Sequence, residues 1–377
     1  MPAGGLDEDD ELTAYPDFDF LQRLGWTPPL SLAIADLDLA YWRLGRVAEV
    51  ARGERYRVLT EHGTLDATLP GRYRHRLDDP DALPTVGDWV VLGPGEPAPL
   101  ERLLPRVGTL HRGAAGEGAE RQLLCAHVNT LLIVSSLNEE LNPRRLERFL
   151  AMAAEGGVLP LVVLTKTDLC ADAASLVAGL QRRLGAVEVL AFSNLHDDVP
   201  ALLAPWCGVG TTLAVVGSSG VGKSTLVNAL LGSPRQAIGA IRDDDGKGRH
   251  TTSRRSLLAL PDGGWIIDTP GLRELKLDVA PQALADVFAE VTVLLGECRF
   301  ADCAHHGEPG CAVQAALDDG RLEPDRWRQY QRLQRESQAQ ANRREESRHQ
   351  RRQRERSFGK MAREVQRGKQ RRRAGLD

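Results

Sequence analysis

The stretch GSSGVGKST at residues 217–225 decides the fold of this 377-residue chain. It satisfies the phosphate-loop pattern G-x-x-x-x-G-K-[ST], follows the apolar run TLAVV, and opens the helical run KSTLVNALLG. Glycines let backbone N–H groups curl around a phosphate, and the first turn of a helix adds partial positive charge. The stretch therefore predicts a phosphate-binding loop between a buried strand and a helix. A chance glycine-rich turn is the alternative.

Every residue of this loop is a candidate contact to a nucleotide. Lys223 can reach the β- and γ-phosphates, and the Ser224 hydroxyl can ligate Mg²⁺. The candidate nucleotide-binding residues of the loop are Gly217, Ser218, Ser219, Gly220, Val221, Gly222, Lys223, Ser224 and Thr225.

Two downstream stretches extend the phosphate site. In WIIDTPG at 265–271, Asp268 ends an apolar strand where it can hold Mg²⁺ through water, and the N–H of Gly271 can meet the γ-phosphate. The polar stretch DDDGKGRHTTSRRS at 243–256 has no helical or strand period, as in a switch loop, although an ordinary flexible loop is the alternative. We assign Ser224, Asp268 and Thr251 to Mg²⁺, with Thr252 left open in place of Thr251.

The residue after DTPG bears on hydrolysis. It is Leu272, where a Ras-like enzyme places its water-orienting glutamine. We therefore expect slow intrinsic hydrolysis, with His250 as the candidate water-orienting group unless it is merely a solvated loop histidine. The candidate catalytic residues are His250, Lys223, Thr251 and Thr252.

A base-recognition element lies upstream of the phosphate loop. The buried run VVLTKTD at 162–168 ends in Thr165, Lys166, Thr167 and Asp168, against the pattern N-K-x-D. The Asp168 carboxylate can accept from the ring N–H and exocyclic amine of guanine, and the Lys166 stem can cover the base. Thr165 replaces the usual asparagine, so one contact to the base and the phosphate loop is weakened or remade. Ser193 in FSNL is the expected contact of the next loop.

The order of these motifs is that of a circularly permuted GTPase domain. Apolar strand runs alternate with helical runs from about residue 128 to 269, which predicts a parallel sheet covered on both faces. A nucleotide site built from strand ends tolerates a different cut in the chain. The permutation places the D-x-x-G element just before the C-terminal segment, so γ-phosphate contacts can move that segment.

A cluster of metal-ligand residues occupies CRFADCAHHGEPGC at 298–311. Cys298, Cys303, His305 and Cys311 make a Cys₃His set, typical of structural Zn²⁺. His306 is the adjacent alternative to His305, and a redox or chance cluster is the alternative to a metal site. The sequence therefore predicts one structural zinc in a C-terminal helical module.

The N-terminal part has a different pattern. Short alternating stretches broken by turn residues from about 41 to 113 predict a small β-barrel, of the OB or the SH3-like type. The first 30 residues are acidic and have neither the basic start nor the apolar stretch of a signal peptide. No apolar run approaches the roughly 18 to 20 residues of a membrane span, so we expect a cytoplasmic protein.

The net charge of −4 conceals an asymmetry. Residues 326–377 hold 18 Lys or Arg and 6 Asp or Glu, a local balance of +12, so the other 325 residues carry −16. A basic segment on an acidic body favours a polyanionic partner such as nucleic acid. A solvated helix of mixed charge is the alternative.

The barrel, the permuted motif order and the zinc signature together closely resemble the ribosome small subunit-dependent GTPase A family. The resemblance covers about residues 35–335, and GRHTT and the zinc spacing are its most specific matches. It implies a late assembly factor whose GTP hydrolysis is stimulated by the small ribosomal subunit, with barrel and zinc module contacting rRNA. Thr165 and the arginine-rich extension depart from the family.

These observations predict a multidomain α/β protein, expected to be a monomer. A P-loop ATPase acting on RNA, or a non-catalytic nucleotide-gated RNA-binding checkpoint, remain the alternatives. The expected parts are an acidic flexible tail (1–30), an OB-type β-barrel (31–114), a circularly permuted GTPase domain (115–275), a zinc-binding helical module (276–335) and a basic arginine-rich extension (336–377).

Overall fold

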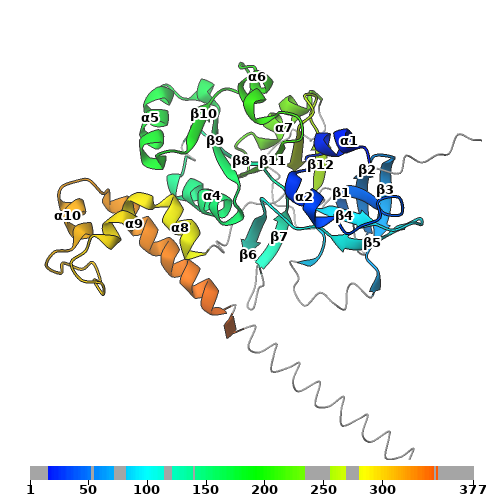
Figure 1. Ribbon diagram of the computed structural model, residues 1–377. Helices are drawn as coiled ribbons and strands as arrows, with labels where there is room; N and C mark the ends of the chain where they lie inside the picture. Colours follow the sequence, from blue (N-terminus) through cyan, green and yellow to red (C-terminus); the bar gives the residue numbers. More distant parts are fainter. Residues whose placement is uncertain are drawn as a thin grey trace, which may run out of the picture. The chain divides into compact units, whose positions relative to one another are not determined.

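The computed structural model describes residues 16–51, 55–71, 82–113, 121–138, 141–233, 255–268, 280–343 and 345–346 (Figure 1). The chain forms two compact units. One comprises residues 1–112 and 121–289, and the other comprises residues 113–120 and 290–377.

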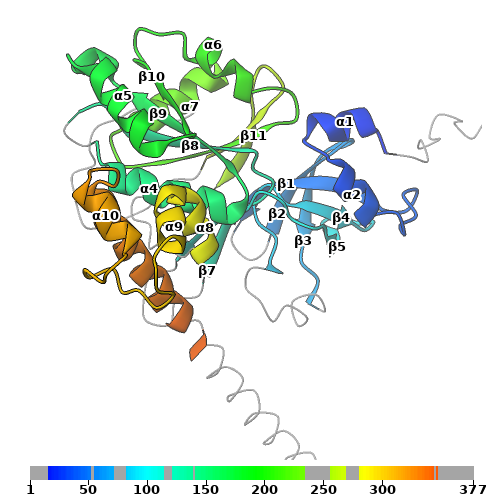
Figure 2. The same ribbon diagram turned by 60° about the vertical axis from the view of Figure 1, so that its left-hand side comes forward.

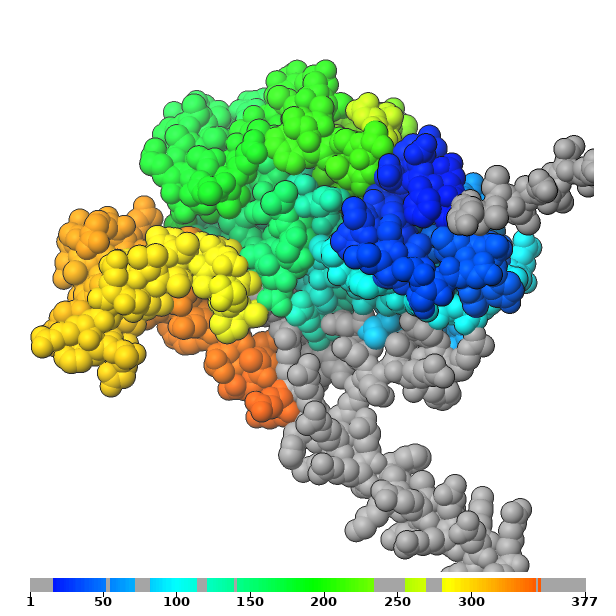
Figure 3. Space-filling view, in the orientation of Figure 1, coloured from blue at the N-terminus to red at the C-terminus, as the bar shows by residue number. Residues whose placement is uncertain are grey.

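Two short helices precede the barrel, α1 (Phe18–Arg23) and α2 (Pro28–Ala33). The Asp17 side chain caps α1 by accepting from the Phe20 N–H at 3.0 Å, and Trp26 meets Trp89 of the barrel edge-on with ring centroids 4.8 Å apart. The atoms of these helices, dark blue in Figure 3, lie against the blue and cyan barrel. The apolar side chains buried in this layer are Leu21, Leu24, Trp26 and Leu30.

The expected flexible tail over residues 1–30 is therefore wrong from residue 18 onward. Its acidic composition masked two signals for a folded segment: an aspartate at a helix N-cap and a proline in the first turn of the second helix. Apolar residues spaced three apart complete the pattern, because they give each short helix a face to bury.

Five strands close into a barrel. They are β1 (Arg43–Ala51), β2 (Arg55–Thr60), β3 (Gly63–Thr68), β4 (Trp89–Leu92) and β5 (Ala98–Leu103). Their order is β1-β2-β3-β5-β4, and β4 pairs back to β1. Only the β3–β5 pair is parallel among these pairings. Closure in this order is that of an OB-type barrel, so the OB prediction is confirmed over the SH3-like alternative.

The next domain along the chain is built on six strands. They are β8 (Thr130–Ser136), β9 (Leu159–Thr165), β10 (Glu188–Ala191), β11 (Thr212–Gly217), β12 (Ser256–Ala259) and β13 (Trp265–Asp268). Their order is β10-β9-β8-β11-β13-β12, and all neighbours are parallel except β12 with β13. The predicted parallel sheet is confirmed, with β12 as an antiparallel edge that no pattern predicted.

Helices cover both faces of this sheet (Figure 2), because its strands are apolar on both sides. α4 (Pro143–Gly156) and α5 (Ala173–Leu184) bury their apolar faces in one core. α6 (Val199–Leu203) and α7 (Lys223–Leu231) bury theirs in the other. α8 (Pro281–Val287) contacts α4, and β6 (Leu110–Gly113) with β7 (Arg121–Cys125) forms a separate two-stranded sheet.

The barrel and the parallel sheet are joined through backbone and side chain. β1 pairs antiparallel with β12, Glu49 opposite Ser256, so the eleven strands form one continuous sheet. Arg46 of β1 is fully buried and donates to the carbonyls of Gly87 at 3.1 Å and His127 at 3.0 Å, and to that of Leu24. Burial lowers the pKa of Arg46 to about 9, and the three carbonyls compensate for the buried charge.

The second unit is helical. α9 (Ala289–Gly296) leads into the cysteine-containing loop, and α10 (Ala312–Asp318) comes after it. A further helix runs over residues 324–343. It buries Trp327, Tyr330 and Leu333, and Arg326 donates to the Glu290 carboxylate at 2.6 Å. The expected helical module is therefore present around the predicted metal cluster.

Candidate nucleotide site and metal cluster

The phosphate loop joins β11 to α7, as the motif predicts. Gly217, Gly220 and Gly222 have φ angles of 146°, 80° and 92°, and Gly222 is the N-cap of α7. These are left-handed conformations that glycine adopts without strain. A Cβ atom at Gly217 would also lie 2.1 Å from the Val134 carbonyl oxygen, so the close approach of β8 to the loop requires glycine there.

Lys223 lies across this loop. Its ammonium donates to the carbonyls of Gly217, at 2.9 Å, and Ser218. Ser219 and Gly220 are exposed, whereas Ser224 and Thr225 at the start of α7 are half-buried. The loop therefore brings backbone donors, one ammonium and one hydroxyl to the carboxyl end of β11, at a helix N-terminus suited to a phosphate.

Arg145 is a neighbour of the loop that the motifs did not indicate. It lies in the first turn of α4, where Asn142 is the N-cap and accepts from the Arg145 N–H at 3.3 Å. The Arg145 guanidinium donates to the Ser218 hydroxyl. Asn142 and Pro143, residue types that are common at a helix start, were the available signal in the sequence, because α4 begins at the carboxyl end of β8, beside the phosphate loop.

The base-recognition stretch ends β9 next to that loop. Thr165 is fully buried, and its hydroxyl donates to the Val221 carbonyl at 2.6 Å, with the Ser135 carbonyl at 3.2 Å. Lys166 has a left-handed φ of 62°, and the 3₁₀ turn η2 (Thr167–Leu169) comes next. The contact to the phosphate loop expected from the missing asparagine is therefore remade by the threonine.

Asp168 lies in this turn with its carboxylate held by a neighbouring loop. The Ser193 hydroxyl donates to it and, with the positive charges of His196 and Lys166, lowers the pKa of Asp168 below its usual range. The carboxylate is therefore ionised near neutral pH and accepts N–H groups. Ser193 is buried, and its hydrogen bond orients the Asp168 carboxylate.

Asn194, the next residue of that loop, also reaches the phosphate loop. Its side-chain amide donates to the Gly222 carbonyl at 3.2 Å. This contact was not predictable from the sequence, because FSNL carries only a weak pattern and the contact depends on how β10 lies beside β9.

Asp268 ends β13, which pairs with β11, so it lies at the same sheet edge as the phosphate loop. The other candidates of this part, His250, Thr251, Thr252 and Gly271, together with Leu272, lie outside the described residues.

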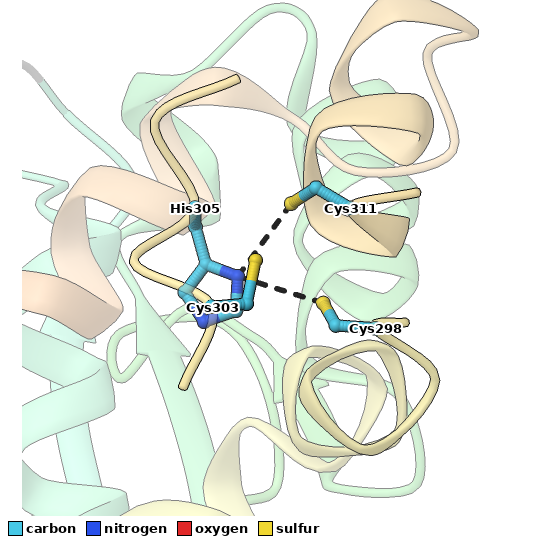
Figure 4. A group of neighbouring side chains, drawn as sticks. All are labelled: Cys298, Cys303, His305 and Cys311. Atoms are coloured by element: carbon cyan, nitrogen blue, oxygen red, sulfur yellow. Dashed lines mark hydrogen bonds between the residues drawn. The ribbon is translucent and has the colours of Figure 1, made fainter. Parts of the chain in front are cut away.

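The four predicted metal ligands come together in the second unit (Figure 4). All four ligand atoms lie within 4.8 Å of one another. The Nδ1 atom of His305 is 3.6 Å from the sulfur of Cys298 and 3.6 Å from that of Cys311. Tetrahedral bonds of about 2.0 Å to nitrogen and about 2.3 Å to sulfur place such atoms about 3.5 Å apart. The cluster therefore has the size and donor set to hold one metal ion.

The loop geometry selects the histidine. His305 adopts a left-handed φ of 61° and turns its ring toward the cysteines, whereas His306 uses its main-chain N–H to donate to Glu308 at 2.7 Å. The Glu308 carboxylate also accepts from the Ala304 N–H at 3.0 Å. Glu308, which the ligand pattern did not indicate, therefore holds the turn that presents His305 and Cys303.

Comparison with known proteins identifies the family. The RsgA GTPase family model matches residues 103–278. A small ribosomal subunit biogenesis GTPase RsgA 2 from Vibrio parahaemolyticus is 42% identical over 362 residues, covering 93% of this chain and 94% of the relative. The chain belongs to the RsgA GTPase family. A relative from Opitutus terrae, named small ribosomal subunit biogenesis GTPase RsgA, is 46% identical over 299 residues, 76% of this chain and 81% of that one.

Solved structures agree with this assignment. The crystal structure of YjeQ from Thermotoga maritima has a TM-score of 0.58 at 25% identity and covers 78% of this chain and 98% of that one. YloQ, described as a circularly permuted GTPase, has a TM-score of 0.57 at 22% identity, covers 79% of this chain and 96% of that one, and supports the fold. The predicted family and the permuted fold are confirmed.

Family membership makes this RsgA-family chain a GTP hydrolase, and such hydrolases act on GTP together with Mg²⁺. The ATPase and non-catalytic alternatives are not supported. A second family model, described as ABC transporter, matches residues 207–373, a range that contains the phosphate loop. Over the part of the chain that the structure describes, no helix is both long and apolar enough to cross a bilayer.

Proposed function

We propose that this protein binds the small ribosomal subunit and hydrolyses GTP there as a late maturation factor. One observation carries the proposal. A phosphate loop and an oriented guanine-recognition carboxylate lie at one sheet edge, in a chain 42% identical over 93% of its length to a small ribosomal subunit biogenesis GTPase.

In this proposal the nucleotide lies along the carboxyl ends of β9 and β11. Asp168 accepts from the guanine N1–H and amine, and the Lys166 side chain covers the base plane. The phosphates lie in the phosphate loop, next to Lys223. Ser224, Asp268 and Thr251 hold Mg²⁺, which neutralises phosphate charge. The residues proposed to bind the nucleotide, directly or by positioning another residue that does, are Thr165, Lys166, Thr167, Asp168, Ser193, Gly217 to Thr225, Asp268 and Gly271.

Hydrolysis in the free protein is slow, because Leu272 stands where Ras-like enzymes have the water-orienting glutamine. His250 orients the attacking water when the small subunit is bound. Lys223 and the backbone donors of the phosphate loop stabilise the negative charge that develops on the transferred phosphoryl group.

The remaining parts bind the subunit. The Cys₃His cluster takes one structural Zn²⁺, because three thiolates and an imidazole whose ligand atoms lie within 4.8 Å of one another suit that ion. Barrel and zinc module contact rRNA, and the segment 326–377, with a local charge of +12, is an additional electrostatic anchor. The protein acts as a monomer in the cytoplasm.

The test is GTP turnover with and without purified small subunits, using large subunits as the control for polyanion effects. We expect phosphate release to rise strongly only with small subunits, and Lys223→Ala to abolish the stimulated rate. Equal stimulation by large subunits or by unrelated RNA would contradict the proposed partner, while labelled GTP displaced equally well by ATP would contradict the base assignment.

A further inference from the structure

Two side chains from two different strand ends hold consecutive carbonyls of the phosphate loop. Thr165, at the end of β9, donates to the Val221 carbonyl at 2.6 Å. Asn194, in the loop after β10, donates to the Gly222 carbonyl at 3.2 Å. Gly222 makes room for this contact, because a Cβ atom there would lie 2.8 Å from the Asn194 amide nitrogen.

These contacts orient the loop's N–H groups. A trans peptide unit is planar, with its C=O and the following N–H pointing in opposite directions. Holding the Val221 carbonyl therefore fixes the direction of the Gly222 N–H, and holding the Gly222 carbonyl fixes that of the Lys223 N–H. Both N–H groups belong to the helix start, where backbone donors bind phosphate.

The Gly222 carbonyl has a second donor, the Leu226 N–H at 2.9 Å, which closes the first turn of α7. Asn194 supplies the other donor that this carbonyl can accommodate. The α7 N-terminus is therefore fixed from the helix side by Leu226 and from the base-recognition side by Asn194.

The orientation of the Asn194 amide is determined by this contact, since a flipped amide would set its oxygen against the Gly222 carbonyl oxygen. The Asn194 Oδ1 atom is buried and has no hydrogen-bond partner among the described residues. Among these residues, the bond to the Gly222 carbonyl is therefore the hydrogen bond that the Asn194 side chain makes.

We propose that Asn194 is a positioning residue for nucleotide binding and that, with Thr165, it replaces the asparagine missing from the T-K-T-D stretch. The Thr165 hydroxyl bonds the Val221 carbonyl, and the Asn194 amide bonds the Gly222 carbonyl. The connection between the base-recognition residues and the phosphate loop is therefore divided between two strand ends. Ser193 orients Asp168 and the adjacent Asn194 orients the Lys223 N–H, so one loop aligns both halves of the site. The inference rests on the proposed assignment of guanine to Asp168.

The experiment measures GDP and GTP affinity by fluorescence titration for Asn194→Ala, with Leu195→Ala as matched control because the Leu195 side chain is exposed. Loss of one net hydrogen bond corresponds to roughly 3- to 10-fold weaker binding. We expect that loss for Asn194→Ala with an unchanged preference for GDP over inosine diphosphate and an unchanged unfolding midpoint of the nucleotide-free protein. Thr165→Asn introduced into Asn194→Ala should restore affinity, because it reinstates the single asparagine.

Unchanged affinity in Asn194→Ala would overturn the proposal. So would an altered guanine-to-inosine preference, a loss that Leu195→Ala reproduces, a lowered unfolding midpoint of the nucleotide-free protein, or a loss that Thr165→Asn leaves in place. Asp168→Asn run in parallel separates the two claims. If Asp168→Asn fails to shift preference from guanine toward xanthine nucleotides, the proposed base site is wrong, whatever Asn194→Ala does.

Discussion

Replacing Arg106 by Met should destabilise the barrel strongly, because it removes the hydrogen-bonded counter-ion of a buried carboxylate. Asp88, the residue before β4, is fully buried. Arg106 donates to both of its carboxylate oxygens, each at 2.7 Å, and the Thr85 N–H donates at 2.7 Å. In Arg106→Met, the Thr85 N–H would be the remaining direct donor to this carboxylate among the residues that the structure describes.

Removing one partner of a buried ion pair costs about 3–5 kcal/mol, since the remaining charge stays desolvated. For a unit of this size, each kcal/mol lowers the unfolding midpoint by about 2–4 °C. We therefore expect the midpoint to fall by roughly 10 °C at pH 8. Arg102→Met is the matched control on β5, because its bidentate partner Asp36 is solvent-exposed and solvent screens that pair.

The deficit should shrink as the pH falls. Burial raises the pKa of Asp88 above its usual value, and the hydrogen bond and charge of Arg106 oppose that rise. Without Arg106 the pKa rises further. A carboxyl with a raised folded-state pKa binds its proton more tightly when folded, so its contribution to stability is present at low pH and is lost as the pH rises through that pKa.

Thermal unfolding of wild type, Arg106→Met and Arg102→Met at pH 8 and pH 5.5 tests this. The unfolding midpoint of Arg106→Met should lie clearly closer to that of wild type at pH 5.5 than at pH 8. The midpoint of Arg102→Met should stay near that of wild type at both pH values. An unfolding midpoint of Arg106→Met equal to that of wild type, or a difference between the two that grows on acidification, would contradict this role of Arg106.

Three further predictions concern the site and the C-terminal parts. Asp168→Asn should weaken GTP binding and improve xanthosine triphosphate binding in a competition titration, because the amide donates where xanthine offers an oxygen. An unchanged preference for GTP over xanthosine triphosphate would contradict a role of Asp168 in guanine recognition. Cys303→Ser should lower zinc content and increase hydrogen exchange over residues 290–330 while GTP affinity stays near wild type; wild-type zinc content would contradict a role as ligand. Deleting residues 340–377 should weaken subunit binding at low salt. The slope of log affinity against log salt should flatten by about 0.7 to 0.9 for each phosphate that the shortened protein no longer neutralises. An unchanged slope would support the alternative that this segment is a solvated helix.

The parallel sheet was predictable from sequence because its strands are short apolar runs that alternate with helical runs. α4 and α6 also begin at residues typical of a helix start, an Asn or Asp side-chain cap followed by a proline in the first turn. The Cys₃His cluster was equally predictable, since its ligands lie within fourteen consecutive residues, 298–311. In both cases the information is local.

The missed features depend on interactions between distant segments. β12 is four residues long and becomes a strand because β13 and β1 pair with it, which no periodicity in SLLA reveals. Arg145 and Asn194 reach the phosphate loop across 73 and 28 residues of sequence. The N-terminal helices bury small apolar faces against Trp89 of the barrel, so composition alone favoured a tail.

The pairing of β1 with β12 has a consequence for how this protein can be dissected. β12 is the last strand of the GTPase sheet, and the barrel strand β1 lies along its open side at Ser256. A chain truncated to begin after the barrel would remove the partner that β1 supplies opposite Ser256 and expose this side of β12, and such edges pair with other chains. The barrel therefore also covers the edge of the GTPase sheet. We expect the isolated GTPase domain to self-associate, with a charged substitution at Leu258 on β12 reducing that association.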